Sequence, residues 1–226
     1  MKVSVIIPVY NGARFICQAI DSVLLQLESD PALTLQILVV NNNSTDNSVS
    51  LVTTTYGSTV ELIEEPRQGL PSARNAGLLR ATAPLIAFLD ADDLWMPGKL
   101  KRQCTILDQQ PELQMVFTQC VEFSDPTGVF PCRTTPLDTP ICSSMLTRKE
   151  VFERAGLFPD FRSGEFIAWY GWTQSLGLST KILPELLFKR RVHAHNTTRD
   201  RTAIADYPRA MAWLLARRRG LATGGP

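Results

Sequence analysis

The chain has 226 residues, of which 44% are hydrophobic and 20% are charged, and its formal net charge is +1. This length suits one large domain and leaves two full domains little room. The near-zero net charge excludes a global field that would favour nucleic acid or an anionic membrane as partner. The longest apolar runs, such as 85–89, are far too short to span a bilayer.

The cysteine content and the start of the chain bear on the cellular compartment. Five cysteines are an odd number, and none forms a C-x-x-C pair. We therefore expect reduced thiols that fill the core rather than a disulfide framework or a structural zinc site. The chain enters a strand-like run at Val3 without a preceding signal segment. A cytoplasmic protein is expected, and a position at the inner face of the membrane is left open.

The first half of the chain alternates apolar strand-like runs with helical periodicity. Strands are expected at 3–8, 35–40, 60–63 and 85–89, and helices at 15–27, after 46 and at 70–81. Ser44 or Asp46 is expected to cap the second helix. Strands that alternate with helices predict βαβ units and a mostly parallel sheet with helices on both faces. The predicted fold class is a single Rossmann-like α/β domain.

The second half of the chain has a less regular pattern. Helices are expected at 97–110, 148–155 and 165–176, strands at 115–120 and 186–192, and a long Pro- and Thr-rich loop at 125–140. The last segment, 201–219, has apolar residues near helical spacing and ends in three consecutive arginines. It is expected to pack against the domain, with contact to a membrane surface or partner as the alternative.

Three polar clusters directly follow apolar strands of the first half. They are Tyr10-Asn11, Asn41 to Asn43, and Asp90 to Asp93. In open sheets of this kind, ligands bind beyond the carboxyl ends of the strands. The clusters are therefore expected to meet at one edge of the sheet and form a site.

Asp90 and Asp92 are the strongest metal-site candidates. In an extended strand end, residues two apart point to the same side. Two ionised carboxylates there would repel each other unless a cation lies between them, and carboxylate oxygens suit Mg²⁺ or Mn²⁺, which also bind substrate phosphates. The alternative is a solvated acidic turn that caps the helix near Pro97. Asp93 is expected to serve as a turn or helix cap rather than a ligand.

Several segments in fixed order make the chain resemble the family 2 glycosyltransferases of the GT-A type over residues 2 to about 198. They are 3–11 (VSVIIPVYN), 41–46 (NNNSTD), 69–77 (GLPSARNAG), 88–93 (FLDADD), 164–165 (GE) and 190–193 (RRVH). The resemblance implies one GT-A domain at 1–198, with a nucleotide-sugar-binding half (1–95) and an acceptor-binding half (96–198). A basic helix and tail (199–226) would follow.

The resemblance also implies roles on the donor side of the site. Pro8 and Tyr10 would line the nucleotide pocket, and Asn42 would contact the nucleobase. Asp90 would hold the ribose or the metal-bound diphosphate, with Ala91 beside it, and Asp92 would ligate the divalent ion, Mn²⁺ or Mg²⁺.

Further implied roles fall on residues outside the acidic segment. Arg74 would pack beside the nucleotide, with a surface salt bridge as the alternative. Arg191 and His193 lie on a segment that closes over the diphosphate in similar enzymes, where His193 would be a metal ligand. The alternative is that Arg190 and Arg191 are a pair of exposed arginines beside an ordinary histidine. Glu165 would be the general base of an inverting enzyme, or else a helix N-terminal carboxylate favoured by the helix dipole.

The chain departs from the family pattern at two places. Asn41-Asn42 stands where Asp-Asp is usual, and an amide oxygen can still accept a hydrogen bond from a nucleobase. Relatives that match the Glu165 segment commonly read E-F-x-D-W-x-x-R, whereas Ala168 and Trp172 replace the second acid and the arginine here. These changes affect the expected acceptor choice and activity.

The expected function is inverting, metal-assisted transfer of a sugar from a UDP-linked donor to an acceptor hydroxyl. The acceptor is a glycan, a lipid-linked sugar or a small molecule, and a homodimer is left open. The alternative is a catalytically weak or inactive nucleotide-sugar-binding relative that acts as a partner subunit. Nucleotidyl transfer is rejected because no Gly-rich basic loop follows the first strand, and a dinucleotide oxidoreductase because no G-x-G-x-x-G opens the first helix.

Overall fold

The computed structural model describes residues 1–125, 130–194, 196 and 205–223. The strands are β1 (Lys2–Val9), β2 (Thr34–Asn41), β3 (Glu61–Glu64), β4 (Leu85–Phe88), β5 (Leu94–Trp95), β6 (Met115–Ser124), β7 (Leu146–Arg148) and β8 (Thr180–Val192). The helices are α1 (Ile16–Ser29), α2 (Ser48–Tyr56), α3 (Leu70–Arg80), α4 (Lys99–Gln109), α5 (Glu150–Ala155), α6 (Glu165–Ser175) and α8 (Tyr207–Thr223). Two short 3-10 turns are η1 (Gly57–Thr59) and η2 (Cys142–Ser144).

The described strands form one mixed sheet in the order β3-β2-β1-β4-β7-β6-β8-β5. Parallel pairs join β1 to β2 and β4, β2 to β3, and β6 to β8. Strand β7 is antiparallel to β4 and β6, and β5 is antiparallel to β8. The predicted mostly parallel α/β fold is thus confirmed.

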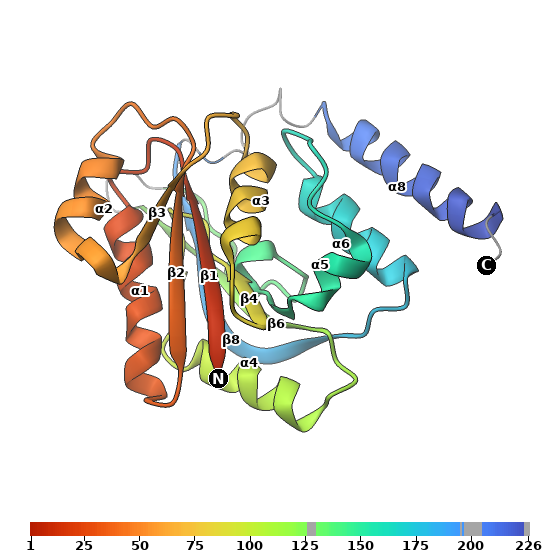
Figure 1. Cartoon of the computed structure of the whole chain (residues 1–226), viewed down its shortest axis with the longest axis horizontal. Helices are drawn as coiled ribbons and strands as arrows, with labels where there is room; N and C mark the ends of the chain where they lie inside the picture. Colours follow the sequence, from red (N-terminus) through yellow and green to blue (C-terminus); the bar gives the residue numbers. More distant parts are fainter. Residues whose placement is uncertain (126–129, 195, 197–204, 224–226) are drawn as a thin grey trace.

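Helices cover both faces of the sheet, as the burial of alternate β1 side chains on opposite faces shows. Val3, Val5 and Ile7 belong to a core cluster shared with α1 and α4, whereas Ile6 packs with α3, α5 and α6. Figure 1 shows α1 and α3 on opposite sides of the first strands. Helix α3 approaches β1 closely, since a Cβ on Gly77 would lie 2.4 Å from Ile6 Cγ2.

The elements of the second half differ most from the sequence prediction. Strand β8 begins at Thr180 rather than at 186, and its pairing with β6 is shifted between Thr118 and Cys120. The two- and three-residue strands β5 and β7 were not predicted. A strand this short has too few residues to show alternation, so only its partners define it.

The last helix, α8, packs against α6, as expected for the C-terminal segment. Ala210 and Leu214 are buried, and a Cβ on Gly171 would lie 2.6 Å from Leu214 Cδ2. Among the residues described, no helix combines the length and the apolar character that crossing a membrane would require.

Candidate active site

The carboxyl ends of β1, β2 and β4 meet at one edge of the sheet, as the sequence predicts. The register pairs Val9 with Asn41 and Ile6 with Phe88, so the segments after these strands are neighbours. Pro8 is buried in β1, while Tyr10 just beyond it is 55% exposed. This edge therefore presents an exposed aromatic ring beside the amide-rich and acidic segments.

The acidic segment after β4 is a turn, which corrects the expectation of an extended strand end. The Asp93 N–H donates to the Asp90 carbonyl at 3.0 Å, and Ala91 lies half-buried within the turn. The rule that residues two apart point to the same side applies to an extended strand and does not apply to this turn. Asp90 and Asp92 accordingly contact different partners.

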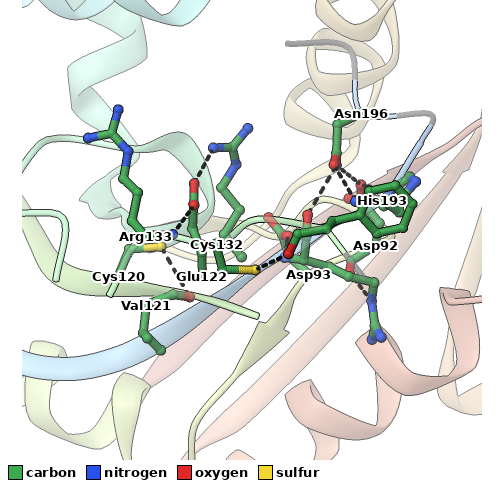
Figure 2. Close-up of polar contacts among 12 residues, drawn as sticks. Asp92, Asp93, Cys120, Val121, Glu122, Cys132, Arg133, His193 and Asn196 are labelled. Carbon is green, nitrogen blue, oxygen red and sulfur yellow. Dashed lines mark hydrogen bonds and ion pairs between the residues drawn. The ribbon is translucent and has the colours of Figure 1, made fainter. Parts of the chain in front are cut away.

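Asp92 contacts the segment that follows β8. His193 Nε2 lies 2.8 Å from Asp92 Oδ2, and the Asn196 amide donates to the same oxygen at 3.2 Å. Figure 2 shows Asp92, His193 and Asn196 gathered at one place. Asn196 was missed in the sequence, because an asparagine three residues after a histidine carries no recognisable spacing.

The donor set at Asp92 fits a divalent ion only if a substrate completes it. No three His, Cys, Asp or Glu side chains within the described ranges converge to form a closed metal site. A carboxylate and an imidazole supply two ligands, and Mg²⁺-type ions are commonly held by one or two carboxylates together with substrate phosphates. Asp92 and His193 therefore match an open site that a diphosphate would complete.

Asp90 belongs to a buried ion-pair network with Arg74 and Glu165. Arg74 donates to Asp90 Oδ1 at 2.7 Å and to Glu165 Oε1 at 2.6 Å, and its side chain is only 3% exposed. Arg74 lies on α3, Asp90 follows β4, and Glu165 is the first residue of α6. The surface salt bridge considered for Arg74 is therefore wrong, because the arginine is in the interior.

Burial and charge act against each other within this network. Burial raises the pKa of the Glu165 carboxyl above its ordinary value, and the adjacent Arg74 charge opposes that rise. Burial alone would lower the pKa of Arg74, but neighbouring negative charges, Asp90 first and Glu165 among them, hold that pKa above the ordinary arginine value. A buried arginine between two carboxylates stays charged, so Glu165 has a permanent cation beside it.

Arg191 is also turned toward protein partners. Its Nε donates to the Asp92 carbonyl at 2.8 Å and its Nη2 to Gln18 at 2.7 Å. The guanidinium lies 4.6 Å from the ring centroids of both Phe15 and Phe123. The alternative of two exposed arginines is wrong, since Arg191 is 3% exposed and the Arg190 side chain is partly buried.

Asp93 is buried by the same strand end. Its carboxylate accepts the Arg191 N–H at 2.9 Å, and burial raises its pKa well above the ordinary value, as do the charges of Asp92 and Asp90. Asp93 thus stabilises a turn, as expected, although its partner is strand β8 rather than a helix.

The asparagines after β2 shape the loop between β3 and α3. The Asn42 amide donates to the carbonyls of Glu65 and Arg67, and its oxygen accepts the Gly69 N–H. Asn41 donates to Glu64 Oε2 at 2.7 Å. An aspartate could not donate these hydrogen bonds, so amides at both positions suit this loop, and both N–H donors of the Asn42 side chain are used within the protein.

The family assignment rests on a match that covers most of the chain. Residues 4–164 match the family model described as glycosyl transferase family 2. The chain belongs to glycosyl transferase family 2. An uncharacterized glycosyltransferase of Nostoc is 45% identical over 105 residues, which cover 45% of this chain and 31% of that protein. The Escherichia coli enzyme WfgD, named UDP-Glc:alpha-D-GlcNAc-diphosphoundecaprenol beta-1,3-glucosyltransferase, is 36% identical over 106 residues, 46% of this chain and 40% of that enzyme.

Solved structures show that this family 2 member has the GT-A fold. S. aureus TarS 1–349 in complex with UDP-GlcNAc superposes with a TM-score of 0.77 at 16% identity, over 95% of this chain and 65% of that one. The Pyrobaculum calidifontis mannosyltransferase PcManGT, with GDP-Man and Mn²⁺, gives 0.71 at 23% identity, over 99% and 65%. The chain thus spans less than two thirds of the length of these relatives.

Proposed function

We propose that this family 2 member transfers a sugar from a nucleoside-diphosphate sugar to an acceptor hydroxyl with inversion at the anomeric carbon. The observation that carries the proposal is the position of Glu165. Arg74 links this buried carboxylate to Asp90. Asp90 is the first residue of the acidic turn, and Asp92 of the same turn contacts His193. A base and a candidate donor site therefore belong to one connected network.

Glu165 would act as the general base. The acceptor hydroxyl gives its proton to Glu165 while its oxygen attacks the anomeric carbon. The bond from that carbon to the phosphate oxygen breaks on the opposite side, and the nucleoside diphosphate leaves with the bonding pair. Burial raises the pKa of Glu165, which makes it a stronger base, and Arg74 opposes protonation in the resting state.

Asp92 and His193 would hold the divalent ion, and Asp90, Ala91, Pro8 and Tyr10 would adjoin the nucleotide. An ion bound there would stabilise the negative charge of the leaving diphosphate. The complex of PcManGT with Mn²⁺ supports a metal in this fold. In this proposal residues 1–95 bind the donor and 96–198 the acceptor.

The names of similar proteins suggest which donor and which acceptor to test first. TarS is complexed with UDP-GlcNAc, and the E. coli relative is named for UDP-Glc and a diphosphoundecaprenol-linked acceptor. We therefore propose a UDP-sugar donor and place a lipid-linked sugar first among acceptors. Exposed Tyr207, Met211 and Leu215 recur every fourth residue on α8 and could contact the membrane that carries such an acceptor.

The test is a turnover screen with Mn²⁺ that uses UDP-Glc, UDP-GlcNAc and GDP-Man against lipid-linked, glycan and small-molecule acceptors. Release of nucleoside diphosphate is measured for the wild type, Glu165→Gln and Asp92→Asn. Glu165→Gln should keep donor affinity and lower kcat by about 10²–10⁴-fold, because the proton acceptor is lost. Asp92→Asn should weaken donor binding only when Mn²⁺ is present.

The matched control is Glu28→Gln, an exposed carboxylate on α1, which should leave kcat and donor affinity unchanged. Equal turnover in the wild type and Glu165→Gln would remove the proposed base. Donor binding without turnover on any acceptor would favour the nucleotide-sugar-binding partner subunit instead.

A further inference from the structure

The segment after β8 is connected to the acidic turn by strand pairing as well as by side chains. Leu94 of β5 pairs with Lys189 of β8, so the antiparallel register brings Asp92 and Asp93 beside Arg191. The backbone N–H of Arg191 donates to the Asp93 carboxylate, and the side-chain Nε of Arg191 donates to the Asp92 carbonyl. One arginine therefore holds two consecutive residues of the turn.

The Arg191 side chain is held in this position by aromatic and polar contacts. Phe15 and Phe123 lie 4.6 Å from the guanidinium, and Gln18 accepts from Nη2 at 2.7 Å. An arginine that serves as a phosphate ligand presents its planar donors to the ligand. Here the Nε donor and one Nη2 donor bind the protein, and the guanidinium lies close to two aromatic rings, which favours a structural task at the acidic turn.

Asn196 completes the connection on the side of the Asp92 carboxylate. The Asn196 Nδ2 donates to Asp92 Oδ2 at 3.2 Å and to the Arg191 carbonyl at 3.1 Å. The Asn196 Oδ1 accepts a hydrogen bond from the backbone N–H of His193 at 2.7 Å. The same amide thus contacts both residues of the Asp92–His193 pair. Figure 2 shows Asn196 directed at this pair.

We infer that Arg191 and Asn196 are positioning residues that fix the Asp92 carboxylate against His193, and that neither binds the diphosphate or the ion itself. This inference rests on the proposed function, because it assigns the Asp92–His193 pair to a divalent ion. Groups that orient metal ligands commonly contribute 10–100-fold to metal affinity.

The substitution Asn196→Asp separates positioning from ligation. If Asn196 only orients Asp92, a carboxylate there repels Asp92 and cannot donate, so Mn²⁺ affinity falls. If Asn196 is itself a ligand, the added carboxylate should tighten Mn²⁺ binding, since hard divalent ions prefer charged oxygen ligands. Arg191→Lys keeps the charge but lacks the Nε donor and the planar group that stacks between the two rings.

The experiment measures Mn²⁺ affinity of the full chain by electron paramagnetic resonance, with saturating UDP, and UDP affinity with EDTA. We expect Asn196→Asp, Asn196→Ala and Arg191→Lys to weaken Mn²⁺ binding about 10–100-fold and to leave metal-free UDP affinity unchanged. The matched controls are Gln109→Glu on the exposed side of α4 and Arg154→Lys on α5, which should leave both affinities unchanged.

A second readout does not depend on the metal. The imidazole nitrogen resonances of His193 in the metal-free protein report its contact with Asp92, and they should change in Asn196→Ala and Asn196→Asp. Unchanged or tighter Mn²⁺ binding in Asn196→Asp, or loss of metal-free UDP affinity in Arg191→Lys, would overturn the inference. If the wild type binds no Mn²⁺ but the His193 resonances still depend on Asn196, the positioning role stands and the proposed metal function fails.

Discussion

Asp90 and Asp92 belong to one turn, but their carboxylates contact different kinds of side chain. Asp90 contacts Arg74, a buried permanent cation that also holds Glu165. Asp92 contacts His193 and Asn196, neither of which is a permanent cation. The Asp90 carboxylate is thus paired directly with a buried arginine, whereas the Asp92 carboxylate contacts an imidazole and an amide, and Arg191 binds its main-chain carbonyl rather than the carboxylate. Neighbouring acidic residues in a D-x-D segment can therefore have separate tasks, one within the fold and one toward the ligand.

Among the substitutions that test this difference between Asp90 and Asp92, Arg74→Met should have the largest effect on stability. The change leaves Asp90 and the buried Glu165 without their shared cation and should lower the free energy of unfolding by about 3–5 kcal/mol. It should also raise the pKa of Glu165 further, since Arg74 opposes the effect of burial. Because a raised carboxyl pKa costs stability as pH rises through it, the deficit should be smaller at acid pH.

Chemical denaturation across pH measures both effects of Arg74→Met. Arg80→Met provides the matched control, because Arg80 pairs with Glu61 at the surface and should contribute no more than about 1 kcal/mol. Similar costs for the two arginines would contradict the distinction between the buried network and an ordinary surface pair.

A smaller effect is expected at Lys99, which shows what burial does to a cation that contacts no carboxylate among the described residues. Its Nζ donates to Gln103 and lies 4.1 Å from the Trp95 ring centroid, and burial lowers its pKa from 10.5 to about 7. Between these values the unfolded chain binds one more proton than the folded protein. Stability should therefore rise with pH across this window, by about 1.4 kcal/mol per pH unit at most.

Lys99→Met should remove that rise, because the side chain no longer titrates. Denaturation at pH 7, 8.5 and 10 compares the two proteins, and the variant should gain most over the wild type at pH 7. A parallel pH dependence in both proteins would mean that Lys99 stays charged, and that a cation in this interior needs no carboxylate partner.

The fold and the site differ in how far the sequence could predict them. The first four strands follow from continuous apolar runs, since a strand buried on both faces, like β1, has apolar residues throughout, and α1 follows from helical periodicity. The short strands β5 and β7 carry no such period, and the start of β8 contains Pro184, which cannot donate to a neighbouring strand. Local pattern therefore predicts the sheet where strands are long and regular.

At the site, the sequence predicted residues more reliably than contacts. The clusters at Tyr10, Asn42 and Asp90 do meet at one edge of the sheet. The extended strand end expected at Asp90 and Asp92 was wrong because the chain turns after Leu89. The role of Asn196 depends on a hydrogen bond across more than a hundred residues. Such contacts are set by tertiary packing, which spacing along the chain does not reveal.

The most direct test of this account is a crystal of the full chain soaked with Mn²⁺ and UDP, with the metal located by anomalous scattering. We predict one peak that is coordinated by Asp92 and His193 and by the diphosphate, while Arg74 keeps its contacts with Asp90 and Glu165. A peak coordinated by Asp90 with Arg74 displaced, or UDP bound away from the acidic turn, would contradict the separation of tasks between the two carboxylates.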